Sequence, residues 1–233
     1  MRMNLPEFLS PQSPQHAREI QNELREKVRI VDDFGGLTLI AGVDVGYDIV
    51  NNLAHASIVT MTQDDLNPID HAQAFVTADF PYIPGLLAFR EIPAILAALA
   101  GLKSVPDILM VDGLGIAHPR RMGIAAHLGV LLDHPTIGVA KSRLTGRHEM
   151  PGPQKGDHTP LMAGKEQIGV VLRSRDNVNP LFISPGHRVS MQTTLDLTLR
   201  CLAKYRLPEP TRMADKFSKV SKLQSGSGGG MLP

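Results

Sequence analysis

The first third of the chain has a pattern of apolar and polar positions that predicts one helix followed by strands. Residues 14–30 carry apolar side chains at helical spacing between charged ones, which is typical of an amphipathic helix that packs on a sheet. Apolar and β-branched runs separated by short polar turns then predict strands at 37–47, 54–61 and 71–80. The first strand is expected to end near Asp44, and three strands in succession predict an antiparallel meander.

The middle of the chain alternates helical and strand patterns. Residues 85–102 predict a helix that Pro93 should kink or divide, because proline lacks the N–H that a helix interior needs. The next patterns predict a strand, a helix and a strand, at 107–112, 119–132 and 136–140. Such an alternation is typical of a βαβ unit with parallel strands.

The last part of the chain is less regular. Residues 145–166 are rich in glycine, proline and charge and predict a long loop. Short strands are expected at 167–173 and 181–184, then a helix at 191–205 with Ser190 as its N-cap. We expect one domain over residues 1–222 and a disordered Gly/Ser-rich tail over 223–233. A mixed sheet with an antiparallel meander before parallel strands predicts a ribonuclease-H-like α/β fold.

Composition excludes several classes of protein but names no function. The 233 residues are 42% hydrophobic and 20% charged, which is ordinary for a globular protein, and no apolar run is long enough to span a membrane. Cys201 is the only cysteine and no secretory signal opens the chain, so a cytoplasmic, monomeric protein is expected. Because the net charge is only +1, nucleic-acid binding would depend on local basic clusters.

Two carboxylates stand where a sheet strand would otherwise be apolar. Asp44 interrupts a run of aliphatic residues, and Asp112 ends the apolar run that begins at Ile108. Burial of a carboxylate is costly unless it is paired or binds a cation. Each residue alone would fit equally well as a turn-capping residue at the end of a strand.

Two further charged residues are placed to join them. Glu91 lies on the helix that follows Gly85, and Lys141 follows the strand at 136–140. Alone, Glu91 would be read as a surface glutamate and Lys141 as a solvated lysine. Together with the two aspartates they predict a site of oxygen ligands, which suits Mg²⁺, or Mn²⁺ as its substitute, better than zinc.

Several ordered segments together are similar to one known family. The chain resembles endonuclease V, a nuclease that attacks DNA containing deoxyinosine, over roughly residues 35–215, and the resemblance is most specific in the segments 81–91 (PYIPGLLAFRE) and 112–121 (DGLGIAHPRR). Further matching segments are AGVDVG at 41–46, TIGVAKSRL at 136–144, NPLFI at 179–183, GHRVS at 186–190 and YRLPEPTR at 205–212.

The resemblance implies a ribonuclease-H-like fold and a set of catalytic residues. Asp44 and Asp112 would hold Mg²⁺, Glu91 would complete the acidic site, and Lys141 matches the catalytic lysine of the family. It also implies hydrolysis of the second phosphodiester bond 3′ to deoxyinosine, which leaves 3′-hydroxyl and 5′-phosphate ends. Tyr82 matches the wedge residue that fills the duplex where a base has rotated out.

The resemblance further implies a pocket for the displaced base, and glycines suit it because their backbone can touch a flat ring. His118 could equally position a phosphate or cap the following helix, and Tyr82 alone would be read as a loop tyrosine packed on the core. Ala214 and Asp215 occupy the region where some members have a histidine near the metal, so metal affinity or preference could differ if Asp215 substitutes for it. The expected pocket residues are Gly85, Leu87, Gly113, Gly115 and His118.

Three functional hypotheses remain open at this point. The first is a repair endonuclease for DNA, double- or single-stranded, that contains deoxyinosine. The second is an endoribonuclease of the same fold that prefers inosine in RNA. The third is a lesion-binding protein without catalysis, against which the set Asp44, Glu91, Asp112 and Lys141 argues, since binding alone does not need paired metal carboxylates.

Overall fold

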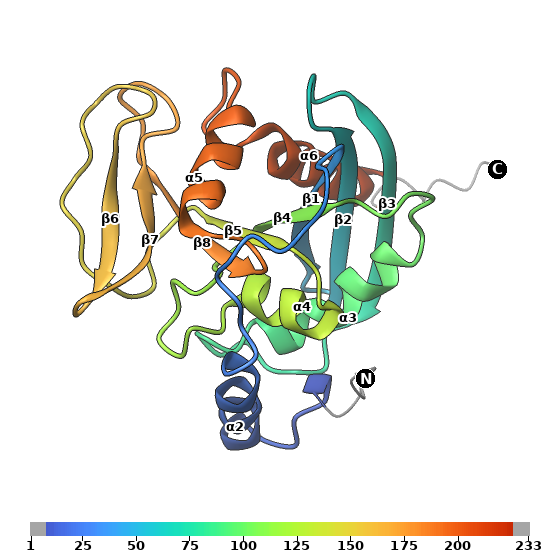
Figure 1. Cartoon of the computed structure of the whole chain (residues 1–233). Coiled ribbons are helices and arrows are strands. Elements are labelled where there is room, and N and C mark those ends of the chain that lie inside the picture. Colours follow the sequence, from blue (N-terminus) through green and yellow to red (C-terminus); the bar gives the residue numbers. More distant parts are fainter. Residues whose placement is uncertain (1–7, 226–233) are drawn as a thin grey trace.

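One eight-stranded sheet runs through the molecule in the order β3-β2-β1-β4-β5-β8-β7-β6 (Figure 1). The computed structural model describes residues 8–225, with side chains as far as residue 219. The strands are β1 Leu39–Asp48, β2 Leu53–Thr62, β3 Pro68–Thr77, β4 Ile108–Asp112, β5 Thr136–Ala140, β6 His158–Ala163, β7 Glu166–Leu172 and β8 Leu181–His187. The helices are α2 Pro14–Arg25, α3 Ala88–Leu99, α4 Ile124–Leu132, α5 Met191–Arg200 and α6 Glu209–Ser225.

The strand pairing confirms the fold class expected from the sequence. β1, β2 and β3 form an antiparallel meander, whereas β4 pairs in parallel with β1 on one side and with β5 on the other. Helix α4 connects β4 to β5, so the predicted βαβ unit is present. The carboxyl ends of β4 and β5 therefore open on the same edge of the sheet.

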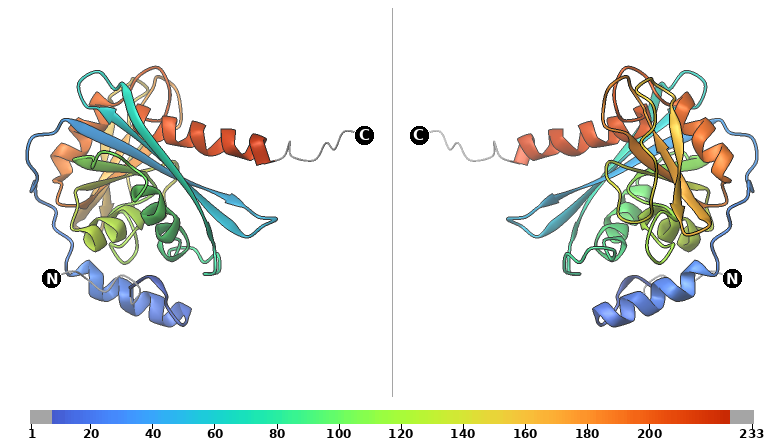
Figure 2. Two further views of the ribbon diagram at one scale, coloured as in Figure 1. Left: turned by 90° about the vertical axis from the view of Figure 1, so that its right-hand side faces the viewer. Right: turned by 90° about the vertical axis from the view of Figure 1, so that its left-hand side faces the viewer.

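Helices cover both faces of the sheet, and alternation along the strands explains how (Figure 2). In β4, Leu109 and Val111 belong to the core beneath α3 and α4, whereas Ile108 and Met110 belong to the core beneath α5 and α6. A strand whose two faces are both buried is apolar along its length, as this one is from Ile108 to Val111. Helix α2 differs from expectation, since it packs chiefly against α4 rather than on the sheet.

Two of the predicted boundaries were wrong, each for a local reason. β1 does not end near Asp44, because residues 44–48 remain paired with β2. Helix α3 continues through Pro93, so no second helical segment starts there, and the kink expected as the alternative stays a prediction. Helix α4 begins at Ile124 and not at 119, because Arg121 adopts a left-handed φ of 58° that a helix cannot contain.

The last third of the chain holds two elements that the sequence pattern did not predict. β6 lies within the segment expected to be a loop, and α6 extends along β1 and β2. Gly42 allows this close approach, because a Cβ there would lie 1.9 Å from the carbonyl oxygen of Pro210. Ser190 is confirmed as an N-cap, since its hydroxyl accepts from the backbone N–H of Thr193 at 3.1 Å.

The expected disordered tail falls mostly beyond the described part of the chain. Residues 226–233 lie outside it, whereas residues 223–225 belong to α6. Within the described residues, no helix has both the length and the apolar character needed to cross a bilayer.

Candidate active site

The register between β1 and β4 brings the two predicted aspartates together. Parallel pairing between these strands ends at Val43 and Val111, so Asp44 and Asp112 are the next residues on the same face. β4 stops at Asp112 while β1 continues beside Ser57 of β2, which opens the sheet between the two carboxylates. The strand-end location expected for both residues is thus correct only for Asp112.

The environment of Asp44 disfavours its charge. Burial raises the pKa of Asp44 well above its ordinary value, and the neighbouring carboxylate of Asp112 raises it further. The hydroxyl of Ser218 donates to Asp44 Oδ2 at 2.9 Å, which partly offsets this effect. Ser218 reaches the site from α6, and sequence reasoning did not identify it.

Lys141 supplies the positive charge nearest to the aspartates. Its Nζ lies 2.5 Å from Asp112 Oδ2 and 4.0 Å from Asp215 Oδ1. Burial lowers the pKa of Lys141, but the carboxylates of Asp112, Asp44 and Asp215 together more than offset it, so the pKa is raised. The lysine therefore remains a cation at neutral pH.

Asp215 lies in the site region, on the face of α6 that approaches Lys141. Its Oδ2 accepts from Lys219 at 2.6 Å, one turn further along the helix. Asp215 therefore adds a third carboxylate beside Lys141. It also carries a cationic partner of its own.

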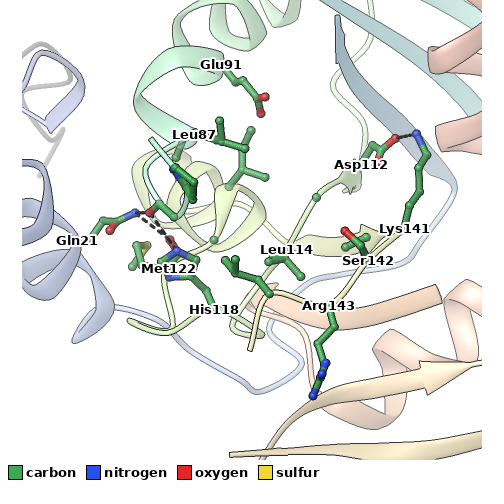
Figure 3. Close-up of a pocket in the computed structure, with 18 of the residues that line it drawn as sticks. Gln21, Leu87, Glu91, Asp112, Leu114, His118, Met122, Lys141, Ser142 and Arg143 are labelled. Atoms are coloured by element: carbon green, nitrogen blue, oxygen red, sulfur yellow. Dashed lines mark hydrogen bonds and ion pairs between the residues drawn. The ribbon is translucent and has the colours of Figure 1, made fainter. Parts of the chain in front are cut away.

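Glu91 lies across the cavity from Asp112, on helix α3 (Figure 3). The hydroxyl of Tyr47 donates to Glu91 Oε1 at 2.8 Å, and the guanidinium of Arg90 lies 4.8 Å from the centre of the Tyr47 ring. Burial raises the pKa of Glu91 to about 8, with the charges of Asp44 and Asp112 adding to the shift. Sequence reasoning missed Tyr47, which follows Asp44 by three residues on the opposite face of β1.

The donor atoms suit a hard divalent cation. Asp44 and Asp112 present carboxylate oxygens at one opening of the sheet, and their mutual repulsion is what a bound cation would relieve. No three acidic, histidine or cysteine side chains within residues 8–219 are grouped tightly enough to hold a metal as they stand. Glu91 is engaged by Tyr47 instead, so the geometry supports the two aspartates first.

A cavity of about 390 Å³ adjoins these charged groups (Figure 3). Four of the five predicted pocket residues line it, together with Tyr82: Gly85, Leu87, Gly113 and His118. Gly115 does not line the cavity. A Cβ there would lie 2.0 Å from the carbonyl oxygen of Pro185, so Gly115 allows close packing against β8.

His118 has a defined protonation state. Its Nε2 lies 3.0 Å from the carbonyl oxygen of Gly85, and its Nδ1 accepts from the backbone N–H of Arg120 at 3.2 Å. Burial lowers the pKa of His118 to about 4, and the charge of Arg120 lowers it further. The ring is therefore neutral with its proton on Nε2. It caps a turn rather than helix α4, and it does not carry a charge for a phosphate.

Tyr82 is not part of the core. Its side chain is 67% exposed at the mouth of the cavity, which excludes a tyrosine packed inside the molecule. It lies on the segment between β3 and α3, before the turn at Gly85. The ring is thus free to meet a partner from solution.

Comparisons with known proteins show the family to which this chain belongs. Residues 22–216 match the family model described as Endonuclease V. The chain belongs to the Endonuclease V family. It is 51% identical over 211 residues to the Endonuclease V of Rippkaea orientalis, covering 91% of this chain and 92% of that protein. The resemblance noted in the sequence is therefore confirmed, and the protein is an endonuclease.

Solved structures of Endonuclease V share the architecture. That from Streptomyces avermitilis superimposes with a TM-score of 0.87 at 42% identity, covering 93% of this chain and 96% of that chain. The enzyme from Ciona intestinalis superimposes with a TM-score of 0.78 at 29% identity, covering 91% of this chain and 98% of that chain. That structure holds a 24mer DNA containing an inosine followed by a ribo-adenosine.

Proposed function

We propose that this endonuclease nicks DNA at the second phosphodiester bond 3′ to deoxyinosine, leaving 3′-hydroxyl and 5′-phosphate ends. The observation that carries the proposal is a single cavity with two parts. One part adjoins the carboxylates that could bind a cation, and the other is lined by backbone and a neutral histidine. The inosine-containing DNA held by the Ciona enzyme supports the choice of substrate.

The proposal gives each side chain a role. Asp44 and Asp112 hold Mg²⁺, or Mn²⁺ in its place, and Glu91 completes the acidic site from the side of α3. The bound cation supplies activation of a water molecule and polarisation of the phosphoryl oxygen. The Lys141 ammonium, 2.5 Å from Asp112, is positioned to neutralise charge that develops on the phosphate.

Recognition is assigned to the other side of the cavity. Tyr82 stacks in the duplex at the gap left by the displaced base, a role that suits its exposed ring. The base enters the cavity beside Gly85, Leu87, Gly113 and His118. Because His118 is neutral, its Nε2–H donates to the Gly85 carbonyl in this wall, and the ring brings no charge to the base.

The test is incubation of the protein with an end-labelled duplex that contains one deoxyinosine, with and without Mg²⁺. We expect a single nick directly on the 3′ side of the nucleotide that follows the lesion, dependent on the metal and absent from the duplex with adenine in place of inosine. Nicking at another position, or equal nicking of both duplexes, would refute the proposal.

A second substrate is favoured by one specific observation. The DNA bound by the Ciona enzyme carries a ribonucleotide directly after the inosine. Inosine-containing RNA is therefore a second candidate substrate of the same site. Parallel reactions on DNA and RNA strands of one sequence separate the two, since a DNA enzyme leaves the RNA strand intact.

A further inference from the structure

A buried amide from the N-terminal helix joins the two walls of the cavity. Gln21 on α2 is only 1% exposed, and its Nε2 donates to the carbonyl oxygens of Gly85 at 3.0 Å and Met122 at 3.2 Å. Its Oε1 accepts from Nε of Arg120 at 2.6 Å. Figure 3 shows the Gln21 side chain reaching the edge of the cavity beside His118.

Only one orientation of the Gln21 amide satisfies these contacts. If the amide of Gln21 were reversed, its oxygen would face two carbonyl oxygens and its nitrogen would face the Arg120 guanidinium. Buried polar groups that are fully paired are costly to disturb. The network therefore specifies a single distance between the Gly85 and Met122 walls.

The Gly85 carbonyl is the centre of the network. It accepts from Gln21, from His118 Nε2 at 3.0 Å and from Arg120 at 2.9 Å. Gly85 has a φ of 80°, and Leu86 N–H donates to the carbonyl of Ile83 at 2.9 Å, as in a type II turn. Three donors on one carbonyl fix the orientation of this peptide.

This turn lies between two groups that the proposed reaction uses. Tyr82 lies three residues before Gly85, and Glu91 follows the turn in the first turn of α3. Met122, on the other wall, precedes Gly123 and Ile124, which also line the cavity. A change in the Gly85 peptide therefore alters the shape of the pocket on both sides.

We propose that Gln21 is a positioning residue for base recognition: its amide holds the Gly85 and Met122 walls at the spacing that admits the displaced base. The inference rests on the proposed function of the cavity. Gln21 is one residue outside the segment that matches the family, residues 22–216. The N-terminal helix thus contributes to substrate selection as well as to packing.

The experiment measures binding by the metal-free protein of two fluorescent duplexes, one with a single deoxyinosine and one with adenine in its place. The variants are Gln21→Leu, which removes all three contacts, and Gln21→Glu, which keeps the acceptor for Arg120 and loses both donors. Gln15→Leu is the matched control, because Gln15 is exposed on the same helix and, within residues 8–219, its side chain hydrogen-bonds to Glu19 alone.

For both Gln21 variants we expect the Kd for the inosine duplex to rise about tenfold, because both lose the two donors that hold the Gly85 and Met122 walls. The Kd for the adenine duplex and both Kd values of Gln15→Leu should stay unchanged. Partial unfolding would raise the apparent Kd of both duplexes by the same factor and leave their ratio unchanged, so a structural role is distinguishable. Wild-type preference for inosine retained in both Gln21 variants would overturn the inference alone. A wild type without preference would overturn the proposed function and the inference with it.

Discussion

The two sides of the cavity satisfy their polar groups in opposite ways. On the acidic side, Asp44 and Asp112 lie next to each other with Lys141 as their nearest cation. Carboxylates in such a position repel, and the pKa of Asp44 is raised in consequence. The acidic side therefore carries negative charge that a bound cation would balance, and a cation there would in turn attract a phosphate.

On the recognition side, the polar groups are paired before any ligand arrives. The Gly85 carbonyl accepts from Gln21, His118 and Arg120, and the imidazole of His118 is neutral. Binding a flat base there requires little reorganisation of the protein. The difference separates two tasks. The repulsion between carboxylates on the acidic side favours metal binding for catalysis, whereas the fixed hydrogen bonds on the recognition side favour selection of the base.

The largest effect should follow from removing charge on the acidic side. We expect Asp44→Asn to lower the rate of metal-dependent nicking about a thousandfold, because a neutral amide binds a divalent cation weakly. The same change relieves the repulsion with Asp112, so the metal-free protein should gain about 1 kcal/mol of unfolding free energy. Nicking assays and urea unfolding measure the two effects.

Asp64→Asn is the control for this comparison, because Asp64 is exposed between β2 and β3. It should change neither nicking nor stability. A loss of stability in Asp44→Asn would show that the carboxylate is satisfied in the folded protein, and the contrast between the two sides would fail.

The next effect tests rigidity on the recognition side. A Cβ on Gly85 would lie 3.1 Å from Arg120 NH2 and 3.2 Å from His118 Nε2, at a φ of 80° that alanine adopts poorly. We expect Gly85→Ala to lower kcat/KM for inosine DNA about a hundredfold, as misplacement of a positioned group does. Kinetics on the inosine duplex measure it.

Gly156→Ala isolates the steric part of that effect. Gly156 has a similar φ of 96°, yet nothing lies within 4 Å of its Cβ position. It should therefore suffer the same backbone penalty, about 1 kcal/mol, and keep its activity. Equal losses of activity in the two variants would show that backbone strain alone, and not the network at Gly85, accounts for the result.

A third effect tests whether a buried histidine behind the recognition side stays neutral. His127 on α4 is completely buried, with its ring at 5.0 Å from that of Phe89, and burial lowers its pKa to about 3. The unfolded chain binds a proton near pH 6.5 while the folded chain does not, so stability falls as the pH drops below 6.5. Between pH 7 and pH 5 this histidine should cost about 2 kcal/mol.

Urea unfolding of the wild type and of His127→Leu at the two pH values isolates this contribution. The leucine variant should lose less stability on acidification by that amount. An identical loss in both proteins would mean that His127 accepts a proton in the folded state, contrary to its environment.

How far the sequence anticipated these two sides depends on the range of the contacts involved. Asp44 interrupts an apolar run, Asp112 ends one and Lys141 follows one. The expectation that strand ends lie together predicted that the three meet, although β1 continues past Asp44. Ser218 contacts Asp44 across 174 positions, and no local pattern indicates such a pair. Tyr47 was missed because its partner Glu91 lies 44 positions away on helix α3, beyond the range of a local pattern.

Secondary structure failed where proline obscured the pattern. β6 contains Pro160, which is tolerated because this strand lies at the edge of the sheet. α6 carries Pro210 at its second position, where a helix accepts proline, although no element was predicted between residue 205 and the tail. The network at Gln21 could not be predicted either, since it depends on carbonyl groups that every residue possesses.

The smallest effect tests whether the recognition side extends to the β6–β7 hairpin. Arg121 donates to Glu166 Oε2 at 2.7 and 2.9 Å and to the carbonyl of His118 at 2.9 Å, which joins the hairpin to the cavity wall. The pair is partly exposed, so we expect Glu166→Gln to cost about 0.5 kcal/mol of stability. The cost should disappear at about 1 M salt, which screens such a pair. Preference for inosine should be unchanged, because His118 remains bonded to Gly85. If Glu166→Gln weakens inosine binding as much as the Gln21 variants do, the β6–β7 hairpin contributes to base recognition and belongs to the recognition side of the cavity.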